Sequence, residues 1–126
     1  MSVGMPQALL LQEFGEHVFR AFGYLPYHVG SSLTDKHGWR DVDVRLIIPD
    51  AEYERMGLGD PRLQHLNARW VSLVLAWSAF GKTLTGLPID FQIQQQSYAN
   101  ETEDHPRSAL FCLFEPARSI TAEESE

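Results

Sequence analysis

Residues 41–48, DVDVRLII, constrain the fold most, because polar and apolar side chains alternate along this stretch. Successive side chains of an extended strand point to opposite faces, so one face carries the apolar residues Val42, Val44, Leu46 and Ile48. Asp41, Asp43 and Arg45 then share the other face. A strand with one apolar face needs a layer packed against it, while its polar face is left for solvent or a ligand.

A second alternating strand is predicted at residues 89–93, where Asp90 and Gln92 lie opposite three apolar side chains. Apolar residues at helical spacing predict a helix over 6–22 and a long helix that has Asp60 as its N-cap and Pro61 at its first position and ends at Gly81. The full predicted order is helix 6–22, strand 27–30, strand 41–48, a short helix 51–56 capped by Asp50 and closed by Gly57, the long helix, strand 89–93 and a strand over 110–114, with loops at 31–40 and 95–108.

These elements predict an α+β fold, in which helices pack on one face of a small mixed β-sheet. The 126 residues fit a single domain over 1–120, followed by an acidic tail, 121–126, that we expect to be frayed. The N-terminal stretch does not look like a secretory signal, and no apolar run is long enough for a transmembrane helix. We therefore expect a cytoplasmic protein that makes no membrane contact.

The formal net charge of -7 bears on the class of partner. An extended nucleic-acid groove depends on clustered Lys and Arg, and so none is expected here. A nucleotide bound through a metal ion remains compatible with this charge, because a divalent ion neutralises carboxylates and phosphates together.

Three carboxylates, Asp41, Asp43 and Asp90, are predicted on the open face of neighbouring strands. Such a concentration of negative charge costs free energy unless a cation lies among the side chains. Magnesium prefers oxygen ligands and keeps positions open for substrate phosphates, so it is the expected ion. The alternative is a set of solvated aspartates on an exposed face. Arg45 shares this face, where it would pair with an aspartate or with a phosphate.

A glycine-serine turn, Gly30-Ser31-Ser32, follows the first predicted strand, and Asp41 comes ten residues after Ser31. Glycine allows backbone amides to approach a phosphate closely, and the serine hydroxyls can donate to phosphate oxygens. Gly-Ser-Ser alone is an ordinary turn. Its position before the carboxylate strand makes Gly30, Ser31 and Ser32 candidate nucleotide-binding residues.

In this order, GS at 30–31, DVD at 41–43 and the aspartate of PIDFQIQ at Asp90 resemble the DNA polymerase beta-type nucleotidyltransferase superfamily, with the closest likeness to short prokaryotic minimal nucleotidyltransferases. The resemblance implies that Gly30 and Ser31 bind a triphosphate, with ATP expected, and that Asp41 and Asp43 ligate Mg²⁺. Asp90 would help hold the catalytic ion and activate the acceptor hydroxyl. Two ions are expected.

The chain departs from that pattern after Ser31, where Leu33, Thr34 and Asp35 replace the usual small residue, Arg and Gly, and before Asp41, where Arg40 replaces the common Ser. These departures bear on phosphate binding, whereas all three carboxylates are intact.

The function that this resemblance implies is Mg²⁺-dependent transfer of a nucleoside monophosphate from a nucleoside triphosphate to an unidentified acceptor hydroxyl. A second hypothesis is a diverged nucleotidyltransferase-fold binding protein, the antitoxin-like half of a toxin-antitoxin pair with a helical HEPN-type partner. Longer members of that superfamily use a second domain to hold the base and the acceptor. Here a helical partner of that kind or a homodimer would supply that side of the site. A third hypothesis is a metal-dependent nuclease, which the acidic charge disfavours.

Overall fold

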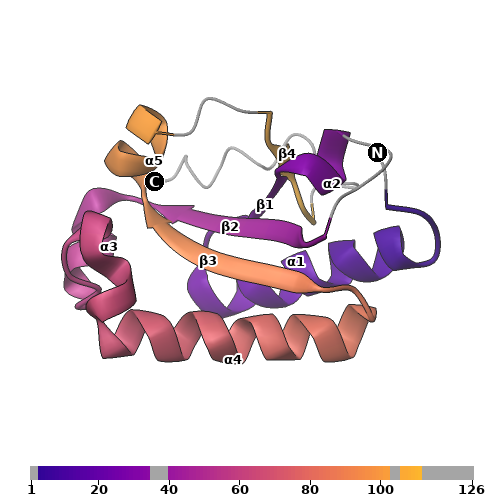
Figure 1. The fold of residues 1–126 in the computed structure, drawn as a ribbon, viewed down its shortest axis with the longest axis horizontal. Coiled ribbons are helices and arrows are strands. Elements are labelled where there is room, and N and C mark those ends of the chain that lie inside the picture. Colours follow the sequence, from indigo (N-terminus) through magenta and orange to yellow (C-terminus); the bar gives the residue numbers. More distant parts are fainter. Residues whose placement is uncertain (1–2, 35–39, 103–105, 112–126) are drawn as a thin grey trace.

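A four-stranded mixed sheet lies at the centre of the structure (Figure 1), a computed structural model that describes residues 3–34, 40–102 and 106–111. Its strands are β1 (Tyr27–Val29), β2 (Val42–Ile48), β3 (Ile89–Gln95) and β4 (Ser108–Ala109), in the order β3-β2-β1-β4. β2 runs parallel to β3 and antiparallel to β1, and β1 runs antiparallel to β4. The prediction of an α+β fold with a small mixed sheet is confirmed.

Two helices, α1 (Gln7–Phe22) and α4 (Ala68–Thr85), cover one face of this sheet (Figure 1). Every second residue of β2, from Val42 to Ile48, and of β3, from Ile89 to Ile93, is apolar and buried against them, as the alternation predicts. Phe14 of α1, Trp77 of α4 and Phe91 of β3 form the centre of an aromatic cluster with ring centroids about 6 Å apart. Tilted and edge-on ring pairs at this spacing add to the stabilisation from burial. The polar residues of β2 and β3 are consequently directed away from α1 and α4.

β3 is an edge strand, and side chains of η1 (Pro61–Leu66) and α4 form hydrogen bonds with backbone groups on its outer edge. Ser78 of α4 accepts a hydrogen bond from the backbone N–H of Phe91 at 2.9 Å. The Trp70 indole donates to the carbonyl of Ile93 at 2.8 Å, and so does Gln64 at 3.0 Å. Pairing of this kind fixes β3 in place and protects its edge from other strands. Trp70 itself belongs to the buried core.

The predicted bounds of the long helix are wrong, because two separate helices cover this stretch. A 3-10 helix, η1 (Pro61–Leu66), begins at Asp60, whose side chain accepts from the N–H of Arg62. Asn67 is extended and caps α4 through the N–H of Trp70. The helix then continues through Gly81 to Gly86, where φ is +74°.

Gly81 was predicted to end the helix, but it lies inside it for a packing reason. A Cβ at this position would meet side-chain atoms of Ile89 and Phe14 at 3.0–3.1 Å. Glycine therefore allows α4 to approach both β3 and α1 closely at this point.

Two segments predicted as loops contain short helices, α2 (Ser31–Thr34) and α5 (Gln96–Thr102), which lie toward the other side of the sheet (Figure 1). The predicted short helix is α3 (Asp50–Arg55). Asp50 makes no capping bond there and instead accepts hydrogen bonds from the backbone and hydroxyl of Ser97 in α5. These contacts tie α5 to the end of β2.

The prediction of a strand over 110–114 is wrong for its two described residues, because Leu110 and Phe111 form a bend in which Phe111 has a φ of +65°. The strand in this region is β4, which ends at Ala109. Residues 112–114 and the predicted acidic tail, 121–126, lie outside the described part of the chain. Within that described part, the helices are too short or too polar to cross a bilayer.

Candidate metal and phosphate site

The register of the two parallel strands brings the predicted carboxylates together. Asp43 and Asp90 are direct partners across β2 and β3, and Asp41 immediately precedes β2. Each of the three offers a carboxylate oxygen within 4.8 Å of the others. Asp41 is exposed, while Asp43 and Asp90 are partly buried on the sheet face that α1 and α4 leave uncovered.

The environment of Asp43 opposes its negative charge. Burial raises the pKa of the Asp43 carboxyl above its usual 3.8, and the charges of Asp90 and Asp41 raise it further, while Arg45 acts in the opposite direction. A cation placed among the three oxygens would relieve both the desolvation and the repulsion. The donor set consists of carboxylate oxygens, the ligand type that Mg²⁺ prefers. These residues therefore fit a divalent hard cation.

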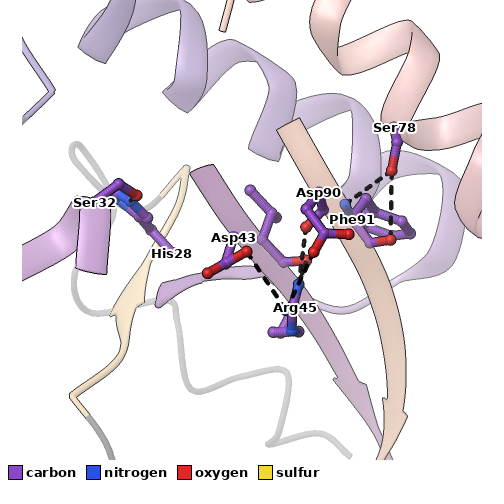
Figure 2. Close-up of polar contacts among 8 residues, drawn as sticks. His28, Ser32, Asp43, Arg45, Ser78, Asp90 and Phe91 are labelled. Atoms are coloured by element: carbon purple, nitrogen blue, oxygen red, sulfur yellow. Dashed lines mark hydrogen bonds and ion pairs between the residues drawn. The ribbon is translucent and has the colours of Figure 1, made fainter. Parts of the chain in front are cut away.

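Arg45 lies between the two partly buried carboxylates (Figure 2). Its Nη2 atom is 3.6 Å from Asp43 Oδ1 and 3.7 Å from Asp90 Oδ2. Its Nη1 atom donates to the backbone carbonyl of Asp90 at 2.8 Å. Of the two partners that the sequence left open for Arg45, the structure shows the aspartates.

Gly30 brings the glycine-serine turn against this cluster. It follows Val29, the register partner of Asp43, and its φ is +82°, in the left-handed region that favours glycine. A Cβ at residue 30 would overlap the Asp43 carboxylate. The site therefore needs glycine here for two reasons, the backbone conformation and the space beside Asp43.

The two serines after Gly30 have different surroundings. Ser31 is exposed at the start of α2. Ser32 is fully buried, and its hydroxyl hydrogen bonds to His28 Nε2 at 2.8 Å (Figure 2). The expectation that both hydroxyls face a phosphate therefore stays a prediction for Ser31, which is exposed, whereas Ser32 is directed into the protein interior.

His28 is a residue whose role the sequence did not reveal. It is fully buried on the helix-covered side of β1, and its Nδ1 atom has no hydrogen-bond partner. Burial lowers its pKa from 6.5 to about 4, so the ring is neutral at neutral pH. The register places His28 opposite Val44, which is a core position. The one available signal was its position two residues before Gly30, inside a short strand.

The three carboxylates could therefore hold a divalent ion, and the glycine-serine turn lies directly beside them. Comparisons with known proteins add nothing to this description: no family model matches the chain, and no curated protein or solved structure matches it either. The features that bear on function are consequently the carboxylates, Arg45 and the turn at Gly30.

Proposed function

We propose that the protein is a Mg²⁺-dependent nucleotidyltransferase with a nucleotidyltransferase-type fold. The observation that carries this proposal is the contact between the Gly30 turn and Asp43, which brings the glycine-serine turn next to three clustered carboxylates. The metal, when bound, would stabilise negative charge on the phosphate oxygens during transfer. Asp41, Asp43 and Asp90 would hold it.

The reaction would move a nucleoside monophosphate from a nucleoside triphosphate, with ATP the first choice, to an acceptor hydroxyl. The acceptor oxygen forms a bond to the α-phosphorus, and the bond from that phosphorus to the bridging oxygen breaks, releasing pyrophosphate. Asp90, the most exposed of the two strand-paired carboxylates at 39% of its side chain, would take the proton of the hydroxyl. Gly30 and Ser31 would position the triphosphate through backbone and hydroxyl donors.

The test is incubation with each labelled triphosphate and Mg²⁺, scored for pyrophosphate release and for label transferred to an acceptor. Asp43→Asn removes one ligand charge and should abolish the Mg²⁺-dependent signal. Glu54→Gln is the matched control, because Glu54 is an exposed carboxylate on α3 outside the cluster. Absence of Mg²⁺-dependent binding of any triphosphate by the unmodified protein would end the proposal.

Two observations favour a second candidate, a binding protein without catalysis. Arg45 already pairs with two of the three carboxylates, which partly neutralises them without a metal. An apolar hollow between α1 and α4, lined in part by Trp77 and Phe80, offers a surface for a helical protein partner or a second copy of the chain. Co-purification with a small helical protein, together with no Mg²⁺ binding, would favour this candidate over the enzyme.

A further inference from the structure

The Arg45 guanidinium is a fixed component of the carboxylate cluster. Its side chain is only 13% exposed. Besides the bond to the Asp90 carbonyl, Nη1 donates to the carbonyl of Val44 at 3.2 Å. Leaving the cluster would break both backbone bonds and expose two acceptors, so the positive charge stays beside Asp43 and Asp90 whether or not a metal is present.

The charges of the cluster match one divalent ion. Three ionised carboxylates and one guanidinium give a local charge of -2, which a single divalent cation neutralises. Two divalent ions about 3.5–4 Å apart, the spacing of two-metal sites, would leave an excess of positive charge before any nucleotide binds. A second ion would also share Asp43 and Asp90 with a guanidinium that lies 3.6–3.7 Å from their oxygens.

We propose that the site takes one divalent ion, and that the Arg45 guanidinium occupies the place and supplies the charge of a second ion. This inference rests on the proposed function and replaces its expectation of two ions. Arginine is suited to this part because its charge is permanent and its planar group donates to several oxygens at once. In the transfer reaction, Arg45 would hold Asp43 and Asp90 in register while the single ion contacts the phosphates.

The experiment counts Mn²⁺ ions bound to the full chain by equilibrium dialysis with a saturating non-hydrolysable triphosphate analogue. Electron paramagnetic resonance of the same samples distinguishes an isolated Mn²⁺ from a coupled pair. We expect one ion per chain and an uncoupled spectrum. Two ions with a coupled spectrum would overturn the inference and leave the proposed function standing, whereas no bound ion would overturn both.

Variants at Arg45 test its part directly. Arg45→Gln removes the charge, so we expect Mn²⁺ affinity without nucleotide to rise by about tenfold or more, and a second ion to bind with nucleotide. Arg45→Lys keeps the charge, and its ion count should stay at one. Arg55→Gln is the matched control, since Arg55 is exposed and paired with Glu52 on α3. Unchanged affinity and ion count in Arg45→Gln would refute the inference, and circular dichroism checks that each variant is folded.

Discussion

Asp43→Asn should stabilise the protein in the absence of divalent ions and remove its response to Mg²⁺. At 4.8 Å, the greatest separation between the cluster oxygens, each repulsion of Asp43 by Asp41 and Asp90 is worth about 0.9 kcal/mol in a water-like dielectric. The attraction to Arg45 at 3.6 Å is worth about 1.2 kcal/mol on the same scale. The two repulsions together exceed this attraction, and burial of Asp43 adds to the cost.

We therefore expect Asp43→Asn to raise the free energy of unfolding by about 1 kcal/mol at pH 7 in EDTA, or Tm by about 4 °C. The sign follows from the raised pKa of Asp43: the unfolded chain gives up this proton more readily, so ionisation destabilises the native state as pH rises through the folded pKa. The advantage of Asp43→Asn should consequently vanish in acid, where both proteins carry a neutral side chain at this position.

Adding Mg²⁺ should reverse the ranking of the two proteins. An ion at about ten times its dissociation constant stabilises the native state by about 1.4 kcal/mol, and the variant lacks one ligand charge. Differential scanning calorimetry in EDTA and across a Mg²⁺ titration measures both effects, with Glu54→Gln as the control. A variant less stable than the unmodified protein in EDTA, or equally stabilised by Mg²⁺, would show that Asp43 is neither repelled by its neighbours nor a metal ligand.

Three further predictions concern the turn and its buried histidine. Gly30→Ala should cost about 1–2 kcal/mol of stability and weaken Mg²⁺ binding in calorimetry, whereas Gly23→Ala, with a similar positive φ but open space around it, should leave Mg²⁺ binding unchanged. Ser32→Ala should lower the free energy of unfolding in urea by about 1–3 kcal/mol because it leaves His28 Nε2 buried without its partner, and adding His28→Leu should recover part of the loss. Because the folded pKa of His28 is about 4 against 6.5, stability should fall by up to about 3 kcal/mol as pH drops from 6.5 to 4; His28→Leu should remove this slope, while His17→Gln, at an exposed site, should not.

The strands and the core could be predicted because apolar residues recur at every second position of each strand and therefore lie on one face. Val42 to Ile48 and Ile89 to Ile93 are buried on the face that the alternation indicated. The pairing of Asp43 with Asp90 needed the parallel register of β2 and β3, which depends on how η1 and α4 cross between them. The local sequence pattern does not specify this path, so the register of β2 and β3 could not be predicted from it.

The errors have local physical causes. The pattern from Leu63 to Phe80 reads as one apolar stripe, yet Leu63 and Leu66 are exposed, and the Asn67 cap begins a new helix. Ser32 looked equivalent to Ser31 because both are polar turn residues. The start of α2 directs Ser32 inward, where His28 gives it a buried partner.

The position of a bound metal decides whether Asp41, Asp43 and Asp90 form a metal site. Crystals grown with Mn²⁺ and a non-hydrolysable triphosphate analogue would locate the ion by anomalous diffraction. We expect one strong peak bounded by carboxylate oxygens of Asp41, Asp43 and Asp90, with the triphosphate lying along the Gly30 turn. A cluster with no peak, with Arg45 still paired to both strand aspartates and the analogue absent or bound elsewhere, would contradict the account.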